Sequence, residues 1–361
     1  MSEHDSPPVD PGFWRGRRVL VTGHTGFKGA WLSLWLQRLG AEVTGLADGV
    51  PTAPSLFALA RVADGLHGHV VADVRDAHAV IDAVATAAPE VVLHLAAQPM
   101  VRRSFSEPRA TFETNVMGTV NVLDAVRTAG AGTVRAVVSV TSDKCYDDRG
   151  RRAPHVEDDP MGGHDPYAAS KGCAELVTDA YRRSFFSASD GPRVASARAG
   201  NVIGGGDWGA ERLVPDLVRA VAAGTSVALR DPDAVRPWQH VLNPLSGYLQ
   251  LAQELHAGAP VDTAFNFGPG ADDVQPVRAV VERLAALWDG ELTVEPAPGP
   301  HPHESPFLAL DSARARERLG WRPRWDLDRA LRATVEWHRG LAAGEDPHAL
   351  TLAQIETFVA L

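Results

Sequence analysis

A glycine-spaced turn near the N-terminus constrains the fold of this chain most strongly. Gly23, Gly26 and Gly29 stand at GxxGxxG spacing, directly after the apolar run Arg18–Thr22 and directly before the helical stretch Ala30–Leu39. The first glycine permits a tight turn, the second lets another group approach the backbone, and the third lets the helix pack closely on a sheet. Strand, turn and helix in this order predict the first βα unit of a parallel sheet.

The first two hundred residues continue this alternation of β-branched runs and helical stretches. Helices are expected to begin near Phe27, Ala77, Arg109 and Asp165, and a final amphipathic helix is expected at Leu327–His338. The expected strands are Arg18–Thr22, Glu42–Leu46, His69–Val71, Val91–Ala96, Arg135–Ser142 and Val194–Gly200. Strands with so few polar residues fit a sheet that is covered on both faces. The pattern predicts an α/β protein with a Rossmann-type doubly wound parallel sheet and a smaller C-terminal α+β lobe.

The regular alternation ends after Asn201, where three consecutive glycines and repeated prolines follow. These residues break regular structure, so we expect a domain boundary near residue 200. We interpret residues 1–16 as a flexible leader and 17–200 as the Rossmann domain, completed by a segment near 236–268. Residues 201–235 and 269–361 then form the smaller lobe, in which Pro296–Pro306 is expected to be a long loop.

The composition excludes several classes of partner. The formal net charge of −10 argues against general affinity for nucleic acid or for anionic membranes. No apolar run approaches membrane-spanning length, and the first residues lack the apolar stretch of a signal peptide. Two cysteines in a chain of 361 residues suit a reducing compartment, which favours the cytoplasm.

The glycine-spaced turn also predicts a ligand, because a pyrophosphate fits the amides and positive dipole end of the following helix. The acid that usually binds the adenine ribose is not cleanly present, since the second strand ends in Gly45-Leu46-Ala47 and Asp48 comes slightly late. No arginine cluster replaces that acid, so NAD is favoured over NADP. The predicted cofactor-binding residues are Gly23, His24, Thr25, Gly26, Phe27, Lys28 and Gly29, then Asp73, Val74, Leu95, Ala96, Ala97 and Gln98.

Two groups of polar residues predict catalysis. Tyr167 and Lys171 form Tyr-x-x-x-Lys, which places both side chains on one face of a helix. A nearby ammonium lowers the pKa of the phenol, so the tyrosine can exchange a proton with a hydroxyl while hydride leaves the same carbon. Ser142, Asp143 and Lys144 follow the fifth strand, where a parallel sheet opens into its ligand crevice. Simple dehydrogenation needs neither an acid nor a base there, so this pair suggests that a second hydroxyl and a second C–H bond also react.

With these residues placed, the chain resembles the extended short-chain dehydrogenase/reductases, and among them the CDP-glucose 4,6-dehydratases, from Arg18 to about His338. The resemblance depends on eight blocks: TGHTGFKGAWLSLWL, LHLAAQPMV, TNVMGTVNVLDA, VTSDKCYD, GGHDPYAASKGCAELV, RAGNVIGGGDW, RPWQHVLNPLSGYL and HPHES. Two segments depart from the family pattern, the residues after Asp48 and Arg149–Glu157, which lacks the usual aromatic stretch.

The resemblance implies a three-step reaction on a nucleotide sugar with NAD as cofactor. Tyr167, helped by Lys171 and Ser142, takes the proton of the C4 hydroxyl while hydride leaves C4, and Tyr167 and Lys171 also contact NAD. Lys144 occupies the position of the base for the C5 proton, where dTDP-glucose enzymes have a glutamate, and Asp143 protonates the leaving C6 hydroxyl. Hydride returns to C6, which yields a 4-keto-6-deoxy sugar.

The expected substrate side chains are Asn201, which resembles a substrate-contacting asparagine of the family, and Arg212 and Arg236, whose guanidinium groups suit a diphosphate. No metal site is expected at His240 or at His301, His303 and Glu304, because these residues lie in proline-flanked loops without further ligands. The helices near 109–128 and 165–184 could form the seam of a homodimer, as in the family, although their apolar faces fit core packing equally well.

Two other functions remain open at this point. A nucleotide-sugar 4-epimerase or 4-ketoreductase needs the serine, tyrosine and lysine but not the acid–base pair Asp143 and Lys144. A non-catalytic NAD-binding sensor needs none of these residues, and the intact set of Ser142, Tyr167 and Lys171 weighs against it.

Overall fold

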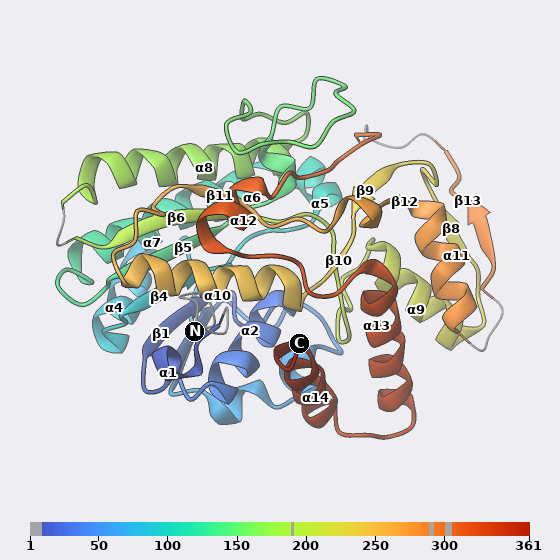
Figure 1. The fold of residues 1–361 in the computed structure, drawn as a ribbon, viewed down its shortest axis with the longest axis horizontal. Coiled ribbons are helices and arrows are strands. Elements are labelled where there is room, and N and C mark those ends of the chain that lie inside the picture. The colour runs from blue at the N-terminus through green and yellow to red at the C-terminus, as the bar shows by residue number, and fades with distance from the viewer. Residues whose placement is uncertain (1–8, 189–190, 289–291, 300–304) are drawn as a thin grey trace.

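A seven-stranded parallel sheet forms the centre of the molecule, in the strand order β11-β6-β5-β4-β1-β2-β3 (Figure 1). The computed structural model describes residues 9–188, 191–288, 292–299 and 305–361. The strands are β1 (Arg18–Thr22), β2 (Glu42–Ala47), β3 (Gly68–Val71), β4 (Val91–His94), β5 (Ala136–Val140), β6 (Arg193–Arg198) and β11 (Ala264–Asn266). The six strands predicted from the sequence are confirmed, as is the Rossmann-type fold class.

Both faces of the sheet are covered, because alternate residues of each strand enter separate cores. Val19 and Val21 face one core, whereas Leu20 between them faces the other. The first core lies under α2 (Phe27–Arg38) and α10 (Leu242–His256), and the second lies under α4 (Ala77–Ala87), α7 (Gly118–Thr128) and α8 (Pro166–Phe185). The predicted helix starts near Phe27, Ala77, Arg109 and Asp165 agree with the structure, the third as α6 (Pro108–Phe112).

The strand order reverses at β1, which lies between β2 and β4. In open α/β sheets, ligands bind at such a switch point, outside the carboxyl ends of the strands. The glycine turn after β1 and the segments that follow β4 and β5 all lie at this end. The short elements here are α3 (Leu56–Leu59), α5 (Val101–Ser106), η2 (Glu113–Met117, a π-helical turn) and η3 (Asp143–Cys145, a 3₁₀ turn), whereas η1 (Val62–Gly65) leads into the start of β3.

A smaller lobe with its own apolar core lies beside one end of the sheet (Figure 1). Its strand pairs are β7 (Val202–Ile203) with β10 (Gln239–His240), β9 (Val235–Pro237) with β12 (Val274–Pro276), and β8 (Val227–Leu229) with β13 (Val294–Pro296). Its helices include α9 (Leu213–Ala223), η4 (Ala271–Asp273), α11 (Val277–Leu287) and α13 (Leu327–Ala342). α10 and β11 return to the large sheet, as the predicted completion near 236–268 requires, while the division into domains stays a prediction.

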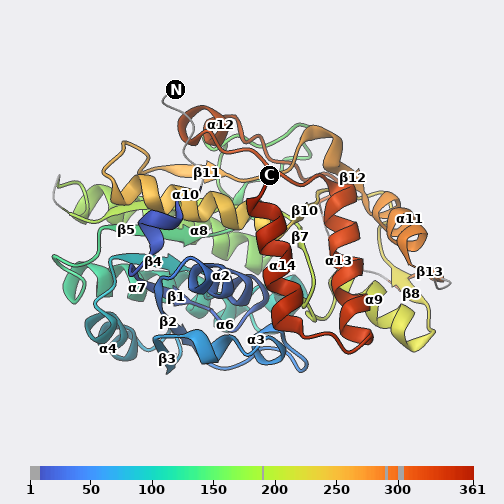
Figure 2. The same cartoon turned by 60° about the horizontal axis from the view of Figure 1, so that its bottom comes forward.

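The last helix of the chain packs against α2, the helix that follows β1. α12 (Ala313–Leu319) precedes α13, and α14 (Pro347–Val359), which the sequence analysis did not predict, lies between α13 and α2 (Figure 2). The rings of Trp35 and Phe358 meet there at a centroid distance of 5.7 Å. The predicted helix Leu327–His338 is confirmed and extends four residues further as α13.

The expectation of a flexible leader is wrong for residues 9–16. Asp10 caps a short helix, α1 (Pro11–Trp14), by accepting the amide of Gly12 at 2.8 Å. The Trp14 ring is fully buried, and its Nε1 donates to Gln253 at 2.7 Å. A buried indole with a satisfied N–H is a strong anchor, and periodicity arguments do not detect a single residue of this kind. No helix within the described ranges is long and apolar enough to cross a membrane.

Candidate active site

The turn between β1 and α2 brings three backbone segments into close contact. A Cβ atom on Gly23 would lie 2.7 Å from the amide nitrogen of Ala96, and one on Gly29 would lie 2.1 Å from the carbonyl oxygen of Gly23. Gly23 also has a φ of 74°, which glycine adopts without strain. Gly26 is the N-cap of α2 and contributes no capping side chain. The first turn of α2 is therefore shaped to receive an anionic group at its amides.

The side chains of His24 and Thr25 serve the fold. The His24 ring is buried edge-on to Phe57 and His69, and burial lowers its pKa to about 4. A Cβ on Gly45 would lie 2.3 Å from this ring, so β2 has a glycine where the ring crosses it. Thr25 donates its hydroxyl to the carbonyl of Gly49 at 2.6 Å. If these two residues bind a cofactor, the backbone makes the contact.

The other predicted cofactor residues lie at the same end of the sheet. Ala96 donates its amide to the Thr22 hydroxyl at 3.2 Å, and the Gln98 amide donates to Asn115 Oδ1 at 2.8 Å. Asp73 accepts Arg75 Nε at 2.8 Å, and the Arg75 guanidinium holds the pKa of Asp73 below its usual range. A shallow surface hollow beside this pair is lined by Asp73, Arg75, Asp76, Glu113, Met117 and Asn121.

The predicted catalytic side chains come together between η3 and α8. Ser142 Oγ donates to Asp143 Oδ1 at 2.9 Å and accepts the Lys144 amide at 3.2 Å. Tyr167 and Lys171 are buried on α8 and face this turn. Burial raises the pKa of Tyr167 to about 12, against an opposing hydrogen bond with Ser142. Burial also lowers the pKa of Lys171 to about 8.

Asp143 has the environment of a carboxylic acid rather than a carboxylate. Burial raises its pKa, although the positive charges of Lys144, Arg236 and Lys28 and a hydrogen bond with Ser142 oppose that shift. Its Oδ2 has no hydrogen-bond partner among the described residues and lies against Gly200, where a Cβ would stand 2.7 Å away. A protonated carboxyl group at this point can donate its proton to a leaving hydroxyl.

The chain has only three lysines, Lys28, Lys144 and Lys171, and every other Lys/Arg residue is arginine. Lys28 and Lys144 lie near Asp143, and Lys171 lies near Lys28. Burial lowers the pKa of Lys28 to about 8, and the charges of Arg212 and Lys171 lower it further. Arginine stays protonated in proteins, whereas a lysine can lose its proton when it is buried. The distribution of lysine therefore marks a site that depends on titratable amines.

The predicted substrate residues reach the same region from the smaller lobe. Arg212 forms an ion pair with Asp207 at 3.0 Å, and its charge opposes part of the rise that burial causes in the pKa of Tyr167. Arg236 is buried and donates to the Val235 carbonyl at 2.9 Å. Asn201 is half-buried in the connection from β6 to β7 and accepts the Gln239 amide at its carbonyl, at 3.1 Å. Arg212 thus lies near Tyr167, and Arg236 lies near Asp143.

Two buried residues behind the site were missed by the sequence analysis. Glu175 lies one helical turn after Lys171, so the spacing Tyr-x-x-x-Lys-x-x-x-Glu could have revealed it. Arg198, at the end of β6, pairs with Glu175 at 2.8 Å, and its position follows only from the order of the strands.

Groups of three or more possible metal ligands do not occur in the described part of the chain. The His240 ring is buried against Trp31 and Trp325, and burial lowers its pKa to about 3. His301, His303 and Glu304, with most of the HPHES block, lie outside the described residues.

Comparisons with known proteins show the family of the chain. A CDP-glucose 4,6-dehydratase of Salmonella typhimurium is 48% identical over 343 residues, which cover 94% of this chain and 95% of that protein. The UDP-glucose 4-epimerase of Thermus thermophilus, solved with NAD, has a TM-score of 0.76 at 29% identity and covers 90% of this chain and 99% of its own. DesIV, the dTDP-glucose 4,6-dehydratase of Streptomyces venezuelae, solved with NAD and TYD, has a TM-score of 0.74 at 26% identity, covering 92% of this chain and 99% of that one. Residues 20–334 match a family model, and the chain belongs to the GDP-mannose 4,6 dehydratase family.

Proposed function

We propose that this protein converts CDP-glucose to CDP-4-keto-6-deoxyglucose with NAD as its cofactor. One observation supports this reaction above the alternatives: Asp143, buried and inclined to hold a proton, is hydrogen-bonded to Ser142 beside Tyr167. A 4-epimerase or 4-ketoreductase has no step that uses such an acid. The 48% identical relative, a CDP-glucose 4,6-dehydratase, supports the choice of nucleotide.

The residues at the switch point fit NAD. The close backbone contacts of Gly23 and Gly29, and a helix N-terminus without a capping side chain, suit a pyrophosphate. The adenine side of the cofactor would be lined by Asp73 and Val74, and the edge of the sheet beside it by the segment Leu95–Gln98. The other end of the cofactor would contact Tyr167 and Lys171. When it is bound, the cofactor supplies the acceptor for hydride from C4 and returns that hydride to C6.

The side chains of this chain would divide the proton transfers among them. Tyr167 takes the proton of the C4 hydroxyl as a phenolate, which the Lys171 ammonium and the Ser142 hydroxyl stabilise before the transfer. Lys144 removes the C5 proton, which the 4-ketone has made acidic, and a proton is returned to C5 when hydride is returned to C6. Asp143 donates its proton to the departing C6 hydroxyl, which leaves as water.

The substrate contacts are assigned to the smaller lobe. Asn201, Arg212 and Arg236 would hold the diphosphate and the sugar, and the ion pair with Asp207 orients Arg212 toward Tyr167. Guanidinium groups bind phosphate oxygens in bidentate geometry, so replacing either arginine with lysine would weaken binding.

The test is incubation of the purified protein with NAD and CDP-glucose, with dTDP-, UDP- and GDP-glucose in parallel. We expect a 4-keto-6-deoxy product from CDP-glucose and no net NADH. Lys144→Ala should stop the reaction after C4 oxidation, so that deuterium from solvent no longer enters C5. An epimerised sugar, accumulated NADH or no product from any of the four would contradict the proposal.

We further propose that the protein is a cytoplasmic homodimer. Leu176 and Phe185 on α8 and Met117 at the end of η2 are exposed apolar residues on helices that pack together. Two copies could bury these side chains against each other. Light scattering during gel filtration should report a dimer that Leu176→Glu dissociates, whereas the control Val294→Glu, on exposed β13, should not. Both cysteines are free, in keeping with a reducing compartment.

A further inference from the structure

A buried ion pair lies directly behind the catalytic lysine. Glu175 follows Lys171 by one turn of α8, and its side chain is only 5% exposed. Its carboxylate accepts hydrogen bonds from Thr141, from Ser196 Oγ at 2.6 Å and from Arg198 Nη2 at 2.8 Å. These donors hold Glu175 as an anion, and its pKa is lowered by Arg198 and by the two hydroxyls, against burial, which opposes the shift.

Arg198 is fixed as firmly as its partner. Its Nη1 donates to the Tyr146 hydroxyl at 2.7 Å and to the Glu157 carbonyl at 2.9 Å, and its guanidinium lies 5.0 Å from the Tyr146 ring centre. The Tyr146 ring also stacks on the His155 ring, at a centroid distance of 4.6 Å. Groups held on several sides cannot rearrange to compensate for a lost charge, so a change at either residue acts directly on its neighbours.

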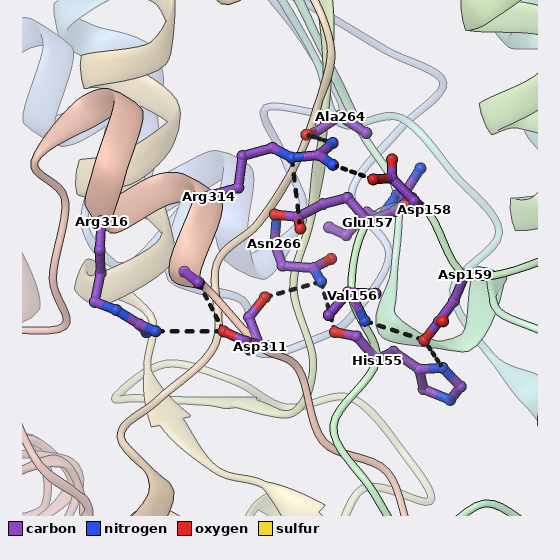
Figure 3. Close-up of polar contacts among 12 residues, drawn as sticks. His155, Val156, Glu157, Asp158, Asp159, Ala264, Asn266, Asp311, Arg314 and Arg316 are labelled. Carbon is purple, nitrogen blue, oxygen red and sulfur yellow. Dashed lines mark hydrogen bonds and ion pairs between the residues drawn. The ribbon is translucent and has the colours of Figure 1, made fainter.

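The loop that contains His155 and Glu157 connects Arg198 and Glu175 to the C-terminal part of the chain (Figure 3). Glu157 Oε1 accepts the Asn266 amide at 2.9 Å, and Asn266 Nδ2 donates to the carbonyls of His155 at 2.9 Å and Asp311 at 3.1 Å. Arg314 joins Asp158 at 2.8 Å on the outside of this cluster. The segment Arg149–Glu157, which departs from the family pattern, therefore ends in contacts that hold Arg198 in place.

The titratable groups that face Lys171 include one carboxylate, Glu175. Tyr167 lies on the same helix, Cys145 on η3, His94 on β4 and Lys28 on α2. The His94 ring, buried between the hydroxyls of Thr22 and Thr119, and the buried Cys145 thiol are both uncharged at neutral pH. Lys171 Nζ has the Val140 carbonyl as an acceptor at a long 3.5 Å. The charge on Lys171 is thus stabilised by Glu175 and opposed by Lys28.

We propose that Glu175 and Arg198 are a pair of positioning residues that sets the protonation of Lys171 during the reaction. Glu175 stabilises the ammonium that supports the Tyr167 phenolate, and Arg198 limits that effect by offsetting part of the carboxylate charge. The proposal rests on the proposed function, because it assigns the pair to the proton transfer at the C4 hydroxyl. Both side chains are buried, and the pair is assigned no contact with the substrate.

Opposite charge changes should move the pH profile in opposite directions. In Glu175→Gln, Lys171 loses its anion and releases its proton more readily, so the alkaline limb of kcat/KM should move to lower pH by about one unit, about a fivefold loss at the old midpoint. In Arg198→Gln, the carboxylate acts alone, and the alkaline limb should move to higher pH. The double variant should return toward the parent, and Glu175→Asp should keep most of the parent profile.

A matched control separates charge from structure. Ser196→Ala removes a hydrogen bond to Glu175 but no charge, so it should lower stability without moving the limb. If Arg198→Gln does not fold, Glu175→Gln and the double variant still decide the matter, since the double variant must recover the parent limb. Equal losses of activity at every pH in all variants would overturn the proposal.

A second readout does not depend on turnover. Competitive acylation with a small anhydride across pH, followed by peptide mass spectrometry, reports the titration of each amine, and the chain has only three lysines. Lys171 should titrate at lower pH in Glu175→Gln and at higher pH in Arg198→Gln, while Lys144 should change little. Unchanged Lys171 titration would refute the pair's role. Shifted Lys171 titration in a protein that makes no 4-keto-6-deoxy sugar would refute the proposed function and leave the charge coupling intact.

Discussion

Two glycine-rich segments border the site, and they are glycine-rich for different reasons. In the turn that contains Gly23 and Gly29, the atoms that exclude a Cβ belong to the backbone. In the segment Gly204–Gly206, the excluding atoms belong to side chains from distant parts of the chain, such as Trp337 on α13 and Leu56 on α3. The turn is therefore a local backbone device, whereas the second segment is made by long-range packing. This difference explains why the turn alone has a recognisable spacing.

The largest effect should follow substitution in the turn. A Cβ at Gly29 would lie 2.1 Å from the Gly23 carbonyl oxygen and 2.7 Å from His24 Cα, and neither atom can move without opening the turn. We expect Gly29→Ala to weaken NAD binding by more than about tenfold and to lower the free energy of unfolding by about 3 kcal/mol. Calorimetric titration with NAD and urea unfolding would measure the two effects. Binding close to that of the parent would mean that the turn is not the cofactor site.

Substitution in the second segment should be milder and should affect the sugar rather than NAD. A Cβ at Gly205 would lie 2.1 Å from Trp337 Cγ, but a ring can shift where a backbone cannot. The Gly205 carbonyl also accepts Trp31 Nε1 at 3.0 Å, which ties this segment to α2. We expect Gly205→Ala to cost about 1–3 kcal/mol and to raise KM for the nucleotide sugar, because the same segment leads to Arg212. An unchanged KM for the nucleotide sugar, together with weaker NAD binding, would show that this segment serves the cofactor rather than the sugar.

The same distinction explains what the sequence could predict. Six strands, the turn and the Tyr167–Lys171 pair follow from local spacing, because period and turn chemistry are properties of adjacent residues. Arg198 could not be predicted as the partner of Glu175, since the contact requires β6 to lie beside β5. Trp14 and α14 were missed for a similar reason: each is anchored by a buried aromatic contact with a segment far away in the chain. Lys28 was predicted as a cofactor-binding residue, but its position next to Lys171 and Asp143 depends on the folded cleft.

Gly45 does not fit a simple division between locally predictable glycines and glycines that depend on long-range packing. It lies in β2, a strand that local spacing predicted, yet a Cβ added at Gly45 would lie 2.3 Å from the ring of His24. We expect Gly45→Ala to cost about 2 kcal/mol, and Gly45→Ala/His24→Ala to be more stable than the sum of the single effects by about 1 kcal/mol. Urea unfolding of the four proteins in the cycle measures this coupling. Strict additivity would show that the ring is not the obstacle.

The smallest expected effect concerns Lys28, the charge that the turn contributes to the site. Its pKa is about 8 in the folded protein against 10.5 for a free side chain, chiefly because of burial. Between these values the unfolded chain binds more protons, so stability should rise with pH across this window, and below about pH 8 the full cost of burying the charge remains. Lys28→Met should therefore stabilise the protein without cofactor at pH 7, on the order of 1 kcal/mol because the side chain keeps partial contact with solvent. The advantage should shrink toward zero by about pH 10. A stability difference that stays constant from pH 7 to about pH 10 would mean that the charge of Lys28 is not its cause. The difference would then come from the packing of the aliphatic part of the side chain.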